Sequence, residues 1–234
     1  INTGSNVIYL AHNVAGTEFN GDVAFTSTGS SQGIWIGINA NGTASIGNGV
    51  SLQVGASGFS AGMLRIRRLT QIGPDAQTLL LTNTASLELG PATTFNGTVD
   101  FRSPQLELDG ATFNGVTYLE KSGATDNTGN GGNIFNGATT LVNSGSGFLL
   151  TANVTADTYN NTLDVINSGS NIIYLAHNVN GTVFNGDVTF TSTGSSQGIR
   201  LGTNVNGTST IANGVSLLVG GGGFTSGILR LRRL

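Results

Sequence analysis

The chain lacks cysteine and holds very few charged residues. None of its 234 residues is Cys, which excludes disulfides, thiolate metal ligands and thiol nucleophiles together. Only 9% of the residues are charged, against about 25% in an average globular domain. One Lys and eight Arg at a net charge of −3 offer no clustered basic surface to neutralise phosphates. We therefore expect no nucleic-acid partner.

Long apolar runs are also missing. None approaches the roughly 18 residues that a membrane span needs, and Ile1 opens no signal peptide. We expect no membrane span in this segment.

Glycine and proline are not frequent enough to indicate disorder. The 37 Gly and 3 Pro together stay below the roughly 25 to 30% that marks low-complexity disorder. The chain is therefore expected to fold, and its 26 Asn beside 37 Gly predict many turns.

A long internal repeat organises the sequence. Residues 1–69 align with residues 166–234 at a constant offset of 165, and 50 of the 69 pairs are identical. Most differences are mild, such as Val7 and Ile172, whereas Trp35 becomes Arg200. Neither end carries the atypical sequence of a capping repeat. We expect one continuous segment over 1–234, within a longer array of further copies of the same repeat.

A shorter period lies inside the long one. Each short unit follows an Asn-Gly pair or a close relative and opens with an alternating apolar run, as in VAFTS or TVDFRS. The units start at residues 21, 49, 77, 97, 115, 137, 161, 186 and 214. Seven units make up the 165-residue period, because the eighth start follows the first by 165 residues. A second alternating stretch and a short Thr-x-Phe segment complete most units.

These units predict an all-β fold. Alternation over four to eight residues indicates half-buried strands, and no stretch carries a 3.6-residue apolar stripe. Two or three short strands in a unit of 18 to 28 residues fit one turn of a parallel β-solenoid. We expect about nine or ten turns in a right-handed coil. The alternative is a row of β-sandwiches of about 80 residues with Asn-Gly hairpins, but the sequence shows no half-period similarity.

Stacked units would align equivalent residues in columns. An asparagine ladder, in which buried side-chain amides bond to one another, is expected from the Asn that precedes each unit. Its members are Asn20, Asn48, Asn96, Asn114, Asn136, Asn160, Asn185 and Asn213. A second corner column comprises Asn13, Asn39, Asn153, Asn178 and Asn204. The simpler interpretation is that Asn-Gly suits turns with positive φ.

Aromatic and charged residues also fall into columns. Inward stacking is expected for Phe19, Phe95, Phe113, Phe135, Tyr159 and Phe184. The charged residues Arg65, Glu88 and Glu107 should share an outward column, with Arg67 near the column that holds Asp109. Contacts between chains are expected at Trp35, Tyr9, Tyr174, Arg65, Arg67, Arg68, Arg230, Arg232 and Arg233.

No arrangement of residues indicates catalysis. The two histidines, His12 and His177, occupy identical YLAHNV contexts with no carboxylate nearby in sequence. Asp100, Glu107 and Asp109 fall on neighbouring turns, so a glycosidase-like carboxylate pair stays open. The calcium-binding GGxGxDxUx repeat is absent. We expect no enzyme activity, no catalytic residue, no metal and no cofactor.

The FNGxVxF phrases, at residues 19–25, 95–101 and 184–190, and the terminal LRLRRL resemble the repeats of a known class. Together with the Cys-free, Lys-poor composition, they are similar to the repeat regions of giant bacterial surface proteins and filament adhesins. The similarity is strongest to the repeat proteins of gliding marine bacteria, which build adhesive or grappling-hook filaments. This resemblance covers the whole chain and implies an extracellular β-solenoid shaft at the cell surface.

The function expected from this resemblance is mechanical. The chain would provide length, stiffness and attachment, with lateral homo-oligomers in a filament and a host or prey cell surface as a further partner. One alternative is a carbohydrate- or ice-binding surface, which needs a regular Thr or aromatic column on one face. A solenoid polysaccharide lyase or hydrolase is the other, and it needs a carboxylate and basic cluster over adjacent turns.

Overall fold

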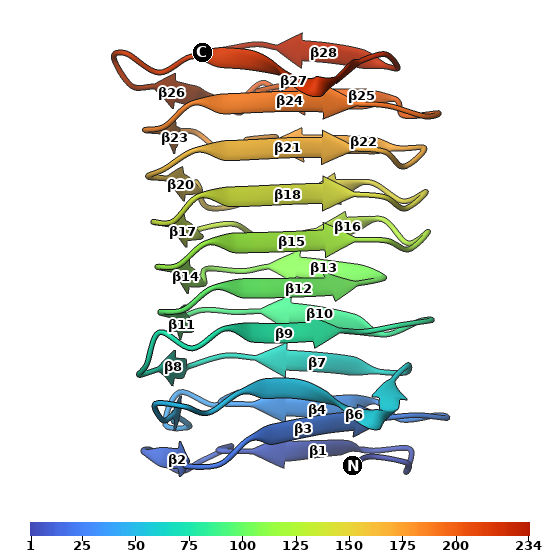
Figure 1. Ribbon diagram of the computed structural model, residues 1–234, viewed down its shortest axis with the longest axis vertical. Coiled ribbons are helices and arrows are strands. Elements are labelled where there is room, and N and C mark those ends of the chain that lie inside the picture. Colours follow the sequence, from blue (N-terminus) through green and yellow to red (C-terminus); the bar gives the residue numbers. More distant parts are fainter.

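The computed structural model describes all 234 residues and contains 28 β-strands and no helix. The strands stack into a column with three faces, and the two ends of the chain lie at opposite ends of its long axis (Figure 1). Every strand pair is parallel, as in the in-register pairing of Leu87 with Leu64 and Leu106. The all-β parallel solenoid of about nine turns expected from the sequence is confirmed, and antiparallel sandwiches are excluded.

The first face is a single sheet of nine very short strands. Its strands are β2 (Thr17–Phe19), β5 (Ala44–Ile46), β8 (Leu69–Gln71), β11 (Thr94–Phe95), β14 (Thr112–Phe113), β17 (Ile134–Phe135), β20 (Thr158–Tyr159), β23 (Thr182–Phe184) and β26 (Ser209–Ile211). We call it the short-strand face.

The second face carries the longest strands and consists of two sheets. A two-stranded sheet holds β3 (Val23–Ser27) and β6 (Leu52–Phe59). The seven-stranded sheet holds β9 (Gln77–Leu80), β12 (Val99–Ser103), β15 (Thr117–Lys121), β18 (Thr139–Asn143), β21 (Leu163–Asn167), β24 (Val188–Ser192) and β27 (Leu217–Phe224).

The third face consists of two five-stranded sheets. The first holds β1 (Val7–Leu10), β4 (Gly33–Ile36), β7 (Met63–Ile66), β10 (Ser86–Leu89) and β13 (Gln105–Leu108). The other holds β16 (Asn127–Thr128), β19 (Leu149–Leu150), β22 (Ile172–Leu175), β25 (Gly198–Leu201) and β28 (Ile228–Leu231).

Successive strands visit the second, third and short-strand faces in turn, so each turn of the coil contributes one strand to each face. Val23 in β3 and Val188 in β24 are equivalent and lie seven turns apart along the axis. A step of about 4.7 to 4.9 Å between strands makes the 165-residue period about 33 to 34 Å long.

The core is a column of inward side chains from all three faces. Aromatic rings on the short-strand face stack on one another, with centroids 5.0 Å apart for Phe113 and Phe135 and 4.8 Å apart for Phe135 and Tyr159. The stack runs from Phe95 to Phe184. Phe19 does not join it, because Ile46 and Gln71 occupy the same column between Phe19 and Phe95.

Buried amide side chains bridge the two places where a face is divided into sheets. Between β6 and β9, the Gln77 amide accepts from Leu52 N at 2.6 Å and donates to Val50 O at 3.1 Å. Between β13 and β16, the Asn127 side chain accepts from Leu106 N at 3.2 Å. Each amide substitutes for a missing strand pairing, so that few buried backbone groups lose their hydrogen bond.

Candidate functional site

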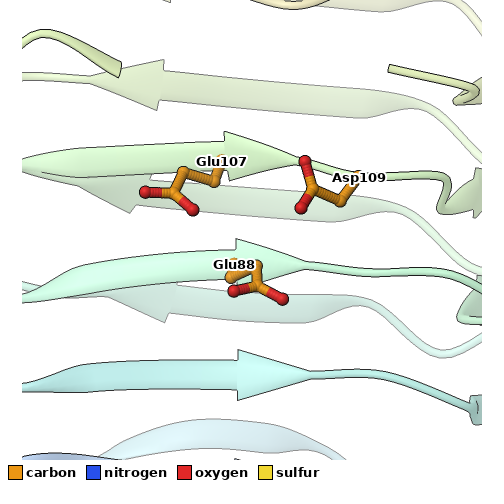
Figure 2. A group of neighbouring side chains, drawn as sticks. All are labelled: Glu88, Glu107 and Asp109. Atoms are coloured by element: carbon orange, nitrogen blue, oxygen red, sulfur yellow. The ribbon is translucent and has the colours of Figure 1, made fainter. Parts of the chain in front are cut away.

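Five charged residues gather on the outer side of the third face. Arg65 lies in β7 and Arg67 directly after it, Glu88 comes from β10, and Glu107 and Asp109 come from β13 and the residue that follows it. Figure 2 shows Glu107 on one strand, Asp109 just beyond the end of that strand and Glu88 on the neighbouring strand. Parallel pairing in register places Arg65, Glu88 and Glu107 in one column, as the alternating pattern of these strands predicts.

Glu88 holds the cluster together. Its carboxylate accepts from Arg65 Nε at 2.5 Å and from Arg67 Nη2 at 2.5 Å, and its side chain is only 1% exposed. The strand pairing continues past Ile66, Leu89 and Leu108, so Arg67 lies near the column holding Asp109, as expected. Its guanidinium binds Glu88, and Asp109 Oδ1 accepts from Asn130 N at 2.7 Å.

Glu107 is a carboxylate without a cationic partner. Partial burial raises the pKa of Glu107, because it disfavours the charged form. The neighbouring Glu88 and Asp109 also raise this pKa, because each of them disfavours a second negative charge. Carboxylate oxygens of Glu88, Glu107 and Asp109 lie within 4.8 Å of one another. Metal ions favour oxygen ligands of this kind, but Glu88 already binds two guanidinium groups and acidic groups often gather without an ion. We assign no metal to this cluster.

Of the three carboxylates considered for sugar chemistry, the fold separates Asp100 from the other two. Asp100 lies in β12 on the second face and pairs with Arg102 at 2.8 Å, whereas Glu107 and Asp109 lie on the third face. Of the basic residues near the cluster, both arginines are bound to Glu88. The surface of the coil contains no pocket.

The last arginine of each of the RIRRL and RLRRL segments contacts its own chain. Arg68 Nη1 donates to the carbonyls of Gly37 and Ile38 at 3.0 and 3.1 Å. Arg233 Nη1 likewise donates to the Gly202 carbonyl at 3.1 Å. Both lie at positive φ, 51° and 53°, and each binds turn carbonyls of the preceding turn. Arg230 and Arg232 form no ion pair.

Aromatic residues continue the charged column towards the N-terminus. Tyr9 packs edge-on against Trp35 with centroids 5.5 Å apart, and the Arg65 guanidinium lies 4.4 Å from the Trp35 ring centroid. In the second copy Arg200 replaces Trp35 and lies 5.7 Å from the Tyr174 ring centroid. Within the chain these side chains therefore form an edge-on aromatic contact and cation–π contacts between successive turns.

The asparagine ladder forms over five of the eight expected positions. Each side-chain amide donates to the Oδ1 of the preceding member, at 2.7, 2.6, 2.7 and 2.8 Å. The linked residues are Asn96, Asn114, Asn136, Asn160 and Asn185. Asn20, Asn48 and Asn213 make no such bond. The ladder also lies at the outer side of the coil rather than in the core, because these residues follow an inward aromatic and the strand alternates.

The second corner column forms in two pieces. Asn39 donates to Asn13, and Asn178 donates to Asn153 at 2.7 Å and accepts from Asn204. The two histidines border this column. His12 packs against Tyr9 and His177 against Tyr174, with ring centroids 4.4 and 4.6 Å apart. His12 Nε2 bonds to Asn39 Nδ2 of this column at 3.3 Å, and His177 Nδ1 bonds to the Thr203 hydroxyl at 2.7 Å, so one hydrogen bond orients each ring.

Two buried ionisable residues were not singled out by the sequence. Asp157 accepts from Asn133 N and Nδ2 at 2.9 and 2.8 Å, and complete burial raises its pKa to about 7. Lys121, the one lysine, donates to the carbonyls of Gly123 and Gly147 at 2.6 and 3.2 Å, and burial lowers its pKa to about 8. Both residues lie at positions where the alternating pattern directs the side chain inward. That pattern could have predicted from the sequence that they are buried.

No protein-family model, curated protein or solved structure matches this chain. The fold also has no helix long and apolar enough to cross a membrane. The fold and the contacts described above therefore carry the functional argument.

Proposed function

We propose that this chain is a segment of the shaft of an extracellular bacterial filament or giant surface adhesin. The observation that carries the proposal is the continuous parallel stacking along one axis, with nine strands in the short-strand face alone. Backbone hydrogen bonds run lengthwise between turns, so a pull along the axis is borne by many parallel bonds at once. Length and stiffness are the properties that such a coil supplies.

The use of charge supports a mechanical role. Two of the three ion pairs, those from Arg65 and Arg67 to Glu88, link successive turns. The asparagine ladder and the aromatic stack likewise connect one turn to the next. The charged, asparagine and aromatic side chains therefore stabilise the stacking of successive turns.

Labelling of intact cells tests the proposed function. Antibodies raised against this chain and coupled to gold should decorate thin, unbranched fibres outside unbroken cells of the source bacterium. Antibodies against a cytoplasmic protein serve as the control for cell integrity. Label that appears only after the cells are lysed would contradict the extracellular shaft.

A second candidate, a carbohydrate- or ice-binding surface, is favoured by one observation. Outward positions of the short-strand face form a column in which Thr recurs, interrupted by Ile134 and Val183. The threonines are Thr70, Thr94, Thr112, Thr158 and Thr210. The Asn ladder runs beside this column, two residues further along each strand.

Binding assays distinguish this candidate from the shaft. A surface of this kind should make the chain co-sediment with an insoluble polysaccharide or inhibit ice recrystallisation. Thr112→Lys should abolish that activity, whereas Thr140→Lys, on the second face, should leave it intact. Failure of the unmodified chain in both assays would exclude the candidate.

A further inference from the structure

The one lysine of the chain lies inside the coil. Lys121 is the last residue of β15 on the second face and is 0% exposed, although lysine is almost never fully buried unless it is paired. None of the three ion pairs includes it. Its amine instead donates to two backbone carbonyls, Gly123 O at 2.6 Å and Gly147 O at 3.2 Å. Lys121 is therefore a buried amine without a carboxylate partner.

The neighbour of Lys121 in the next turn is an asparagine. β15 pairs with β18 in register, so Lys121 lies beside Asn143, and both side chains are fully buried. Neighbouring strands are about 4.7 to 4.9 Å apart, a distance that a lysine side chain can span. Asn143 Nδ2 donates to Gly147 O at 3.0 Å, the same oxygen that accepts from Lys121. The amine and the side-chain amide therefore converge on one carbonyl oxygen.

The Asn143 amide is only partly used in hydrogen bonding. Its Oδ1 is buried and has no hydrogen-bond partner, whereas buried polar atoms are nearly always paired. This oxygen is free to accept a proton when a nitrogen adds to the amide carbon. Asn167 also has a buried Oδ1 without a partner, but its neighbours in register are Asn143 and Ser192. Asn143 is thus the member of this column that has a lysine beside it.

Burial also favours the reactive form of the amine. Only an uncharged amine is a nucleophile. Burial lowers the pKa of Lys121 to about 8, against the smaller opposing effect of Asp126. About one molecule in ten therefore carries the uncharged amine at pH 7.

We propose that Lys121 and Asn143 form an amide cross-link between successive turns. Nζ of Lys121 adds to Cγ of Asn143, the bond from Cγ to Nδ2 breaks, and Nδ2 leaves as ammonia. The proton that Nζ loses moves to Nδ2, and Gly147 O contacts both nitrogen atoms along this path. The reaction needs no oxidant and no further reactant. Its product joins β15 to β18 by a covalent bond in addition to their backbone hydrogen bonds.

Digestion with an endoproteinase that cleaves after lysine tests the cross-link, because the chain has a single lysine. The enzyme requires a free lysine amine, so a cross-linked Lys121 resists it even after the chain is unfolded in urea. We expect the unfolded chain to stay in one piece and its intact mass to be lower than the sequence mass by one ammonia. Complete cleavage into fragments 1–121 and 122–234 would overturn the proposal, with or without a loss of ammonia elsewhere in the chain.

Two variants identify the partner of Lys121. Asn143→Ala should restore the full mass expected for that variant and make the unfolded chain cleavable after Lys121. Asn167→Ala is the matched control, because it removes a buried amide from the same column and leaves Lys121 and Asn143 in place. Its unfolded chain should resist cleavage.

Two results with these variants would also contradict the cross-link. Resistance that persists in Asn143→Ala would show that another group blocks Lys121. Cleavage of Asn167→Ala to the same extent as Asn143→Ala would show that Asn143 is not specifically required. Either result leaves the proposed shaft untouched, whereas failure to label surface fibres would refute the shaft and leave the cross-link standing.

Discussion

At the scale of single residues, charge acts between neighbouring turns. Glu88 neutralises two arginines of the preceding turn and is almost completely buried, whereas Glu107, one position further along the same column, has no cationic partner. These two glutamates share a strand register and differ in their surroundings. Their substitutions therefore separate the effect of the ion pairs from the effect of removing a negative charge.

Glu88→Gln should lower the free energy of unfolding by about 2 kcal/mol. Breaking a fully buried pair costs roughly 3 to 5 kcal/mol, and the loss here is smaller because the Arg65 and Arg67 side chains remain 22% and 28% exposed. Glu107→Gln should be neutral or stabilising, because burial and its acidic neighbours already disfavour its charge. Urea unfolding of both variants checks this, and an equal loss in both would contradict it.

Asp157 should make stability depend on pH. Burial raises its pKa from 3.8 to about 7, so between those pH values the native state binds more protons than the unfolded state. The free energy of unfolding then falls as pH rises from about 4 to about 7. Asp157→Asn should remove this fall, on the order of 3 kcal/mol. Urea unfolding at pH 4, 5.5 and 7 measures it, and an unchanged pH profile in the variant would rule out Asp157 as its source.

At the scale of the strand and its turn, the recurring Asn-Gly pair has a specific role. Gly49 and Gly214 have positive φ, 75° and 84°, as the simpler interpretation expects, whereas the glycines at 97, 115 and 137 do not. A Cβ on Gly137 would instead lie 2.1 Å from the carbonyl oxygen of Gly115 in the preceding turn. At these three positions glycine is required because the backbones of successive turns pass too close for a side chain.

Gly137→Ala should destabilise the protein by about 1 to 3 kcal/mol, the usual cost of overpacking. Gly21→Ala is the matched control, since Gly21 follows Phe19 and Asn20 in the same motif but a Cβ added to it would meet no atom within 4 Å. Its stability should change little. Thermal unfolding of the two variants compares them, and equal shifts would show that crowding is not the cause.

Asn136→Ala removes two bonds of the ladder, one donated to Asn114 and one accepted from Asn160. Because the ladder lies at the surface, where water can replace a lost partner, we expect a loss of about 1 kcal/mol. Asn20→Ala, outside the linked part of the column, should cost less. Chemical denaturation measures both, and a larger loss for Asn20→Ala would contradict the ladder.

Much of each element was readable from the sequence. Alternation located the strands, such as β3 and β12, because inward and outward residues differ in polarity at every second position. The positions where side chains leave the pattern were not readable. Nothing in the local sequence says that Gln77 bridges two sheets or that Arg67 binds Glu88, since both depend on how one turn is placed on the next.

At the scale of the whole molecule, the repeat determined the architecture. An offset of 165 residues that equals seven short units predicted stacked turns, and the structure places Val23 and Val188 seven turns apart. The binding partners of the coil could not be predicted from the sequence. The same residue types occur in every turn, and they stabilise the stacking of the turns on one another.

The axial advance per repeat tests the central claim most directly. Proteins with two, four and six tandem copies of the 165-residue unit can be imaged by electron microscopy and their contour lengths compared. A continuous coil predicts that each added unit lengthens the particle by about 33 to 34 Å. Separate β-sandwich beads of about 80 residues would add about 60 Å for each unit, and that result would contradict the account.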